Sequence, residues 1–234
     1  GSTGNKAFWA KWTAIVYFTV IFDAQGGTVS PSSISVPLLS TPGTLPIPSY
    51  SDCNFKGWFT TPAIAGTPFT STTQVAGNIT VYARWTVTDV EGNEYKTVRI
   101  GNRTWMAENL KTAHYSSGTE IPQNNAWTFP STDPAYCSYA NDNTNKSTYG
   151  LLYNWYATYR GHIAPTGWHV ADTSDWNALV QSAGGASVAA GKLKETGNSH
   201  WTNGVNTATN ETGFTALPGG QRVEDAFQDL HGVG

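Results

Sequence analysis

The stretch "NITVYARWT" at 78–86 marks the end of one folding unit, because nearly the same nine residues occur earlier in the chain. Residues 5–13 read "NKAFWAKWT", with Asn, an aromatic residue, Ala, a basic residue, Trp and Thr at matching positions. The spacing is 78 minus 5, or 73 residues. Self-similarity at a fixed spacing is typical of tandem modules. We therefore predict that one structural unit ends at Thr13 and the next at Thr86.

The segments between the two copies have the composition of short strands. "VYFTVIFD" at 16–23, "SSISV" at 32–36 and "CNFKGWFTT" at 53–61 are rich in β-branched or aromatic residues and are separated by Gly, Pro and Ser. The connection "VPLLSTPGTLPIPSY" at 36–50 cannot be a regular helix, because each Pro removes an amide donor and restricts the residue before it. We therefore predict a small all-β module.

Three segments of this module resemble a known family. "FTVIFDAQGGTVSPSSISV", "GTLPIPSYSDCNFKGWFTTP" and "ITVYARWT" are similar to the Listeria–Bacteroides repeat, of the internalin B-repeat type. The resemblance implies a β-grasp-like module over 15–86, of a kind found in tandem on bacterial surface proteins, mainly as a stalk or spacer. Residues 1–14 are then the end of a preceding repeat, and the opening Gly-Ser is typical of a tag remnant.

After Thr86 the sequence changes character. "DVEGNEYKTVRIG" at 89–101 predicts a hairpin with a Glu-Gly-Asn turn. "DTSDWNALVQSAGG" at 172–185 predicts a helix, with Asp172, Thr173 or Ser174 as cap, Trp176, Leu179 and Val180 as the apolar stripe and Gly184 at the end. A second, shorter helix is predicted at about 186–195, whereas "YGLLYNWYAT" at 149–158 fits no single period.

This second region also resembles a family. "YKTVRIGNRTWMAENL", "YGLLYNWYA", "APTGWHVADTSDWNALV" and "NETGFTALPGGQR" are similar to the Fibrobacter succinogenes major paralogous (FISUMP) domain, over 87–234. That family is similar to C-type-lectin-like folds. The resemblance implies an α+β domain displayed on, or secreted from, a bacterial cell. The expected fold class is therefore mainly β with α+β, as a β-grasp-like repeat module followed by a C-type-lectin-like domain.

The C-terminal stretch "ETGFTALPGGQR" at 211–222 raises the question of how the second fold is completed. We expect Phe214, Ala216 and Leu217 on the inward side of a strand, with Pro218 to Gly220 supplying a tight turn. In related domains a strand with a Trp-Trp-Ser motif follows, and this chain has none. We therefore expect a C-terminally truncated fold or a pairing strand from elsewhere.

The segment after this turn is the expected binding surface. The resemblance extends to the variable binding proteins of diversity-generating retroelements, in which variation would be displayed after "LPGGQR". The alternative is a surface loop ordered only by a further strand. The candidate ligand-binding residues are Trp201, Arg222, Glu224, Asp225, Gln228, Asp229 and His231.

The six tryptophans of the second region fall into two groups by their sequence context. Trp127 and Trp201 lie in polar loops and are the candidates for exposed rings that stack on a sugar, with a half-buried loop anchor as the alternative. The others lie in apolar patterns and are predicted to be core residues: Trp105, Trp155, Trp168 and Trp176.

No arrangement of residues points to catalysis. The five histidines show no H-E-x-x-H or H-x-x-x-H spacing, and no G-x-S-x-G elbow occurs. The resemblance reaches the formylglycine-generating enzymes, which need two reactive cysteines in one domain, and this region holds Cys137 alone. We therefore predict no enzyme activity, no catalytic residue and no cofactor.

Calcium is the one metal ion for which the sequence leaves a binding site as an alternative. "NDNTNKSTYGLL" at 141–152 places Asn at alternate positions as an EF-hand loop does, but Lys146 replaces the turn Gly and Leu152 the bidentate Glu. An irregular loop site for a structural calcium remains an alternative, with Asp133, Asp142 and backbone oxygens as ligands.

Composition limits the partners. The 234 residues carry 13 Lys and Arg against 16 Asp and Glu, a net charge of -3, so no basic surface for nucleic acid is expected. The apolar run "IVYFTVIF" at 15–22 is too short to span a bilayer.

The family resemblances and the composition together predict a bacterial cell-surface or secreted ligand-binding or adhesion protein. The repeat would be the stalk and the lectin-like domain the head, with an unknown protein or glycan on a host or neighbouring cell as partner. The alternative is a purely structural surface protein, and the third reading is an enzyme related to formylglycine-generating proteins.

Overall fold

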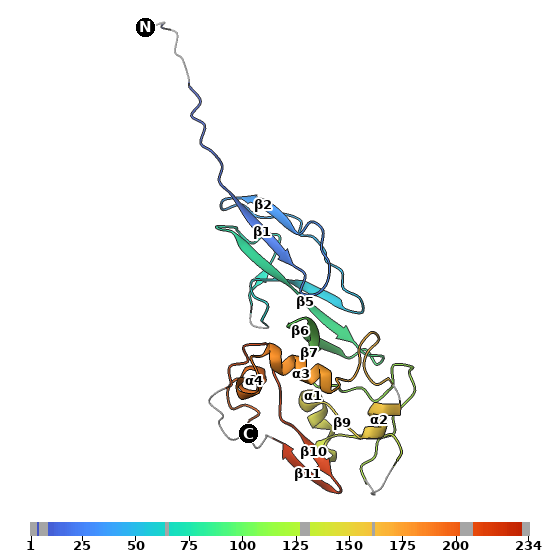
Figure 1. Cartoon of the computed structure of the whole chain (residues 1–234). Helices are drawn as coiled ribbons and strands as arrows, with labels where there is room; N and C mark the ends of the chain where they lie inside the picture. Colours follow the sequence, from blue (N-terminus) through green and yellow to red (C-terminus); the bar gives the residue numbers. More distant parts are fainter. Residues whose placement is uncertain are drawn as a thin grey trace.

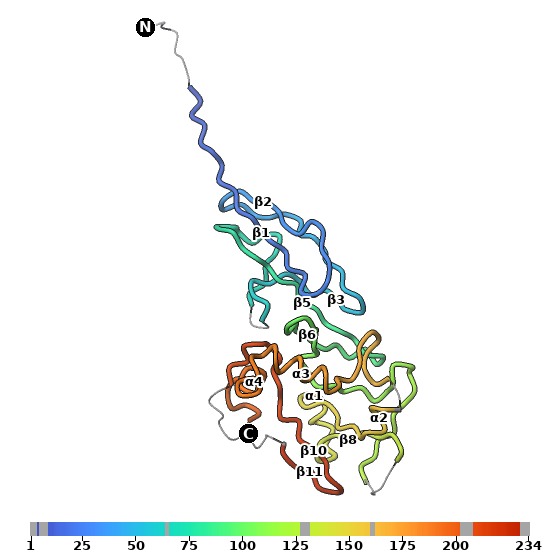
Figure 2. Tube along the Cα trace, in the orientation of Figure 1, coloured from blue at the N-terminus to red at the C-terminus, as the bar shows by residue number. Residues whose placement is uncertain are grey.

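A computed structural model describes residues 4, 9–63, 66–126, 132–160, 162–201 and 208–230. Within them the chain forms two units stacked along one long axis, with strands dominating the first and helices joining strands in the second (Figure 1). Residues 9–16 project from the outer end of the first unit, and β11, the last described strand, lies in the second (Figure 2). The predicted mainly β fold with α+β character is confirmed.

The first unit is built on one mixed sheet. β1 and β5 run parallel at its centre, and the other neighbours are antiparallel. The strand order is β2-β1-β5-β3-β4. The strands are β1 (Tyr17–Asp23), β2 (Ser33–Pro37), β3 (Asn54–Phe59), β4 (Pro68–Phe69) and β5 (Ile79–Thr88).

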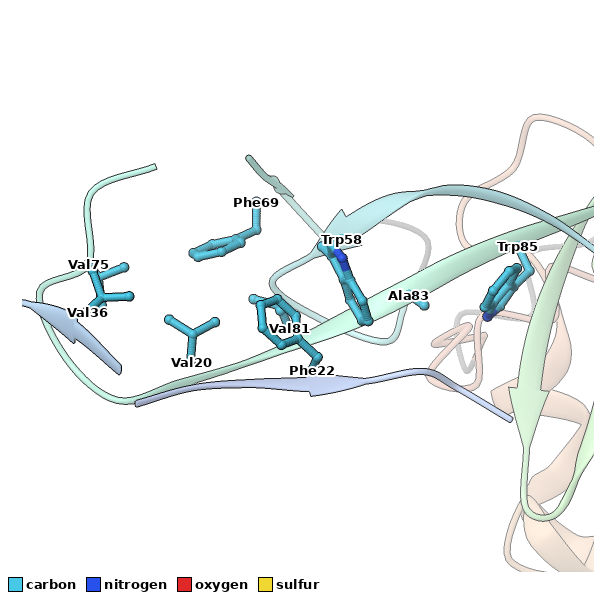
Figure 3. Close-up of a cluster of buried hydrophobic side chains, with 9 residues drawn as sticks. All are labelled: Val20, Phe22, Val36, Trp58, Phe69, Val75, Val81, Ala83 and Trp85. Atoms are coloured by element: carbon cyan, nitrogen blue, oxygen red, sulfur yellow. The ribbon is translucent and has the colours of Figure 1, made fainter. Parts of the chain in front are cut away.

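Aromatic rings and valine side chains together fill the core of the first unit (Figure 3). Phe22 packs on Trp58 with ring centroids 4.8 Å apart, and the Trp58 indole donates a hydrogen bond to the carbonyl of Pro46 (2.9 Å). Trp85, from the repeated motif, is buried and donates to the carbonyl of Ala24 (2.9 Å). Its counterpart in the first copy, Trp12, is 92% exposed. The motif's tryptophan is thus a core residue only where its module surrounds it.

β5 does not stop at the end of the first core. Thr86, Val87 and Thr88 pair with Lys96, Tyr95 and Glu94 of β6 (Glu94–Ile100), which pairs in turn with β7 (Arg103–Met106). The predicted hairpin is therefore confirmed, with β5 as its first strand. A continuous hydrogen-bonded ladder joins the two units.

A single carboxylate holds the turn of this hairpin. Asp89 is buried and accepts hydrogen bonds from the backbone N–H groups of Glu91 (3.0 Å) and Asn93 (2.9 Å). It also accepts from the Tyr95 hydroxyl (2.6 Å), which itself accepts from the N–H of Lys111 (3.1 Å). A buried acid is stable here because both of its oxygens are used.

The second unit contains short helices and two further pairs of strands. Its strands β8 and β9 pair antiparallel, as do β10 and β11. The elements are β8 (Tyr136–Cys137), the 3-10 turns η1 (Tyr139–Asn141) and η2 (Asn143–Asn145), α1 (Lys146–Tyr149), β9 (Leu152–Tyr153), α2 (Trp155–Arg160), α3 (Thr173–Ser182), α4 (Ala186–Leu193), β10 (Gly219–Val223) and β11 (Ala226–Leu230).

α3 begins where the sequence predicts. The carboxylate of Asp172 accepts from the N–H of Asp175 (2.9 Å), and the carboxylate of Asp175 accepts from the N–H of Asp172 (2.9 Å), which completes a capping box. Leu179 is buried against Val98 and Trp105 of the β6–β7 hairpin.

α4 is also confirmed, although it ends at Leu193, two residues before the predicted end. The segment 149–158, whose apolar residues fit no single helical or strand period, contributes to β9 and α2.

Two of the four tryptophans predicted to be core residues are exposed. Trp155 is 67% exposed because Ala157, two residues along α2, is the buried position, which turns Trp155 and Tyr159 outward as a stacked pair 5.2 Å apart. Trp176 is 48% exposed, since it lies at the edge of the α3 face that buries Leu179. Trp105 is buried as predicted, and Trp168 is half-buried.

The segment before β10 is not the strand we expected. Only Ala216 forms a bridge, with Lys194, and Thr215 has φ 59°, which interrupts an extended conformation. Phe214 nevertheless packs inward against the α3 core. Gly219 and Gly220 begin β10 instead of forming a tight turn, although Gly220 has φ 70°.

Side chains reinforce the junction between the two units. The Tyr50 hydroxyl hydrogen-bonds the Thr104 hydroxyl of β7 (2.9 Å), and the Tyr50 ring lies edge-on to Trp85 (5.6 Å). Gly167 of the second unit lies directly against the Asp52 side chain, where an added Cβ would overlap with the carboxylate. The loop 50–53 of the repeat therefore packs closely on the second unit.

We predict that Gly167→Ala destabilises the protein more than Gly118→Ala in equilibrium urea unfolding. Both glycines have positive φ, 77° and 85°, so both variants lose about 1–2 kcal/mol to backbone strain. Only the Cβ at 167 meets another group, Asp52, whereas that at 118 has no atom within 4 Å. Adding Asp52→Ala to Gly167→Ala should restore part of the difference. Equal losses for the two glycine variants would show that the junction is not closely packed.

Candidate functional site

The C-terminal candidates lie on a β-hairpin. β10 and β11 pair antiparallel, with Gln221 opposite Gln228 and Val223 opposite Ala226, and Glu224-Asp225 form the two-residue turn. Glu224 has φ 55°, as such a turn requires. The alternative of a loop ordered only by a further strand is therefore wrong for the described residues, because β10 finds its partner in β11. His231 lies outside the described residues.

Arg222 anchors this hairpin to the rest of the second unit. Its side chain is only 5% exposed, and its guanidinium donates to the carbonyls of Asn124 (3.2 Å), Asn125 (3.2 Å) and Glu224 (3.1 Å). The guanidinium also lies over the ring of Phe227, 5.0 Å from its centroid. A buried guanidinium needs this many acceptors. Arg222 thus positions the hairpin, which differs from the ligand contact that the sequence predicts.

The hairpin's inner side packs on one aromatic residue. The Phe227 ring lies edge-on to Tyr139 of η1 at 5.2 Å, and Gly220 lies so close to the Tyr139 ring that a Cβ there would overlap with it. Gln228 follows Phe227 on β11 and is exposed, because successive side chains of a strand point to opposite faces. The hairpin is therefore held in a fixed position with one face outward.

The outer side and tip of the hairpin are polar and acidic. Glu224, Asp225, Gln228 and Asp229 are all exposed. The Asp229 carboxylate accepts a hydrogen bond from the Gln221 side-chain amide (2.7 Å). Asp225 Oδ1 lies 3.4 Å from Arg222 Nη2. Three carboxylates within the six residues 224–229 favour a basic or hydrogen-bond-donating partner.

Trp201 lies apart from the hairpin residues. Its ring is half-buried, its Nε1 donates to the carbonyl of Ala216 (3.2 Å), and the Lys194 ammonium lies 4.3 Å from the ring centroid. These contacts fix Trp201 between the end of α4 and the segment that leads to β10. The structure therefore brings the hairpin candidates together and places Trp201 at a second location, as a loop anchor. Trp127 lies outside the described residues.

The candidate calcium ligands have other partners. The Asp142 carboxylate accepts from the N–H (2.9 Å) and hydroxyl (2.8 Å) of Thr144 and caps η2, and these hydrogen bonds lower the pKa of Asp142. The Asp133 carbonyl accepts from the Asn154 amide (2.7 Å). In the part of the chain that the structure describes, no three His, Cys, Asp or Glu side chains gather to hold a metal ion.

One polar cluster was not predicted from the sequence. Asp175 is buried, and its carboxylate pairs with Arg103 of β7 and hydrogen-bonds His169 Nε2 (2.8 Å). The sequence shows Asp175 only as an acid in the first turn of α3, because Arg103 lies 72 residues away. The three side chains tie α3, β7 and the segment before α3 together. They border a pocket of about 770 Å³ that the repeat and the second unit line jointly.

Both cysteines are free and their thiols are poor nucleophiles. Burial, with a smaller contribution from the Asp52 carboxylate, raises the pKa of Cys53 to about 11. Burial also raises the pKa of Cys137, although Arg222 opposes the shift. The thiolate is the reactive form, so neither residue is activated at neutral pH.

Comparison with protein families identifies both parts of the chain. Residues 98–232, more than half of the 234, match the Fibrobacter succinogenes major domain, and residues 18–84 match the Listeria-Bacteroides repeat domain. The order is the one that the sequence predicts. These are repeat and surface-type families and not enzyme families, and together they indicate a bacterial surface protein.

Two further comparisons and one structural finding complete this description. No curated protein and no solved structure matches the chain. Among the described residues, every helix is too short or too polar to cross a membrane.

We predict that Arg222→Lys loosens the hairpin while leaving the rest of the fold intact. Lysine keeps the charge but cannot reach three carbonyls, so the local free energy of opening should fall by about 2–3 kcal/mol. Hydrogen exchange of the β10 and β11 amides measures this value. Gln228→Ala, an exposed change in the same hairpin, is the control and should have little effect. Unchanged protection in Arg222→Lys would contradict the anchoring role.

We predict that Cys53 is alkylated slowly by iodoacetamide. With a pKa of about 11 instead of 9.0, its thiolate fraction at pH 8 is about 100-fold lower than that of an ordinary thiol. The rate should therefore rise with pH up to about 11. Mass spectrometry of the native protein measures it, and Cys53→Ser should remove the labelling because Cys137 is buried. Fast labelling at pH 8 would contradict the raised pKa.

Proposed function

Because this chain belongs to the Fibrobacter succinogenes major domain family, we propose that it is a ligand-binding or adhesion protein of the bacterial surface or of secreted material. The repeat is the stalk, over 15–86, and 87–234 form the head that binds a protein or glycan of a host or neighbouring cell. Residues 1–14 are the end of a preceding repeat, which their similarity to 78–86 supports.

The observation that carries this proposal is the anchored hairpin. A buried Arg222 and the Phe227–Tyr139 contact hold the hairpin in place, so its polar side chains are presented without a large entropic cost on binding. The exposed residues Glu224, Asp225, Gln228 and Asp229 form the binding face. Figure 1 shows β10 and β11 at the end of the second unit that lies away from the repeat, where a partner would reach them first.

The head is proposed to be C-type-lectin-like. Its combination of short strands with α3 and α4, and a hairpin near its C-terminal end, is compatible with that fold. If the chain belongs to the group diversified by retroelements, the outward side chains of this hairpin are the positions at which variation changes the ligand without changing the anchor.

The two other readings find less support in the site. A purely structural surface protein does not require the exposed acidic face that this hairpin presents. An enzyme related to formylglycine-generating proteins would use activated thiols, and burial keeps Cys53 and Cys137 protonated.

We predict that the whole chain, probed on glycan and host-protein arrays, gives saturable binding that depends on the hairpin. Asp225→Ala combined with Asp229→Ala should reduce the affinity about tenfold or more, and added salt should weaken binding because the carboxylates are exposed. Glu120→Ala, an exposed acid outside the hairpin, is the matched control.

The position of Trp201, beside the end of α4, is tested separately. The variant Trp201→Ala is measured on the same arrays. Loss of binding in the hairpin variant but not in Glu120→Ala supports the proposal, and loss in Trp201→Ala would extend the face to α4. Arrays without any saturable signal would favour the structural reading.

A further inference from the structure

The pocket between the two units is the feature that the proposed function leaves unused. It has a volume of about 770 Å³, within the range of roughly 300–1,000 Å³ that small-molecule sites occupy. One wall is the loop 50–53 of the repeat. The opposite wall comes from β7, the segment 163–171, α3 and Phe214. The site is therefore incomplete without the repeat.

An aromatic surface lies along one side of the pocket. Trp105, Trp176 and Phe214 contact one another, with ring centroids 5.4 Å apart for Trp105–Trp176 and 6.5 Å for Trp176–Phe214. Trp105 is buried beneath, whereas Trp176 keeps about half of its surface open. An open indole in a concave site has a large apolar area still available to a ligand.

Polar groups with unused hydrogen-bonding capacity border the aromatic surface. The Asp52 carboxylate is exposed and has no hydrogen bond or ion pair among the described residues. His169 is 70% exposed and uses Nε2 for Asp175, which leaves Nδ1 without a partner in the described structure. The buried Nε1–H of Trp105 has no hydrogen-bond acceptor among the residues that the structure describes.

The charges of the pocket disfavour two classes of ligand. Arg103 is neutralised by Asp175, and Asp52 repels anions, so an acidic ligand is disfavoured. A wholly apolar ligand would bury the Asp52 carboxylate without a partner, which is also unfavourable. A neutral ring with hydroxyl groups meets both requirements: its C–H face stacks on an indole, and its hydroxyls donate to a carboxylate.

We propose that this pocket binds a neutral saccharide. One sugar ring stacks on Trp176, and hydroxyl groups of the sugar hydrogen-bond Asp52 of the repeat and His169 of the second unit. Tyr50, held by Thr104, fixes the loop that carries Asp52. The repeat is therefore part of a binding site as well as a stalk. The pocket reaches Gly219 and Gly220 at the start of β10, but the exposed acidic residues of the hairpin do not line it.

Intrinsic tryptophan fluorescence and calorimetry of the whole chain test the proposal. The probes are neutral linear oligosaccharides of glucose, galactose, mannose and N-acetylglucosamine, four to six units long. We expect a saturable fluorescence change for at least one of them. Trp176→Ala should weaken its binding at least tenfold, and Asp52→Ala severalfold.

Matched variants distinguish saccharide binding in the pocket from other causes of a fluorescence change or a loss of affinity. Trp155→Ala removes an indole that is more exposed than Trp176 but lies outside the pocket, so it should bind as the unaltered protein does. Trp176→Phe retains an aromatic ring and tests stacking if Trp176→Ala unfolds, which thermal melting reveals. Asp225→Ala in the hairpin should not change saccharide binding, so failure of either site is recognised independently.

Three results would overturn the proposal. The first is the absence of saturable binding for every neutral oligosaccharide. The second is unchanged affinity in a folded Trp176→Ala variant, or in Asp52→Ala if Trp176→Ala unfolds. The third is equal loss in Trp155→Ala, which would place the site elsewhere.

Discussion

The structure depends on one strand that belongs to both units. Within the ten-residue strand β5, residues 79–86 pair with β1 or β3 in the first sheet, and residues 86–88 pair with β6 of the second unit. Trp85 closes the first core directly before the strand crosses over. Because the peptide ladder is unbroken, the relative orientation of the units is set by strand twist and not by a flexible linker. This constraint helps to bring the two walls of the pocket at the junction together.

What could be predicted from the sequence was local. The α3 cap lies within three residues of its partner, and the hairpin turn depends on Asp89 and the residues beside it, so short patterns revealed both. The repeated motif revealed where the first unit ends. These features need no knowledge of what packs against them.

What the sequence missed was set by contacts distant along the chain. Trp155 and Trp176 have the same apolar surroundings in sequence as Trp105, yet burial depends on which helix face meets the hairpin of β6 and β7. Arg222 looked like a surface cation, but carbonyls about 98 residues earlier surround it. The ion pair of Arg103 and Asp175 spans 72 residues. A single sequence carries no signal for such pairings.

The parallel pairing of β1 and β5 has a mechanical consequence. The chain enters the first unit at the start of β1 and leaves it at the end of β5, and Val20 to Asp23 pair with Ile79 to Tyr82 in the same direction. Tension between an anchored N-terminal end and a partner held by the second unit would pull these strands in opposite directions along their length. The hydrogen bonds between them would then be loaded together, in shear, instead of opening one after another. A stalk with this topology resists pulling along the axis on which an adhesive contact would load it.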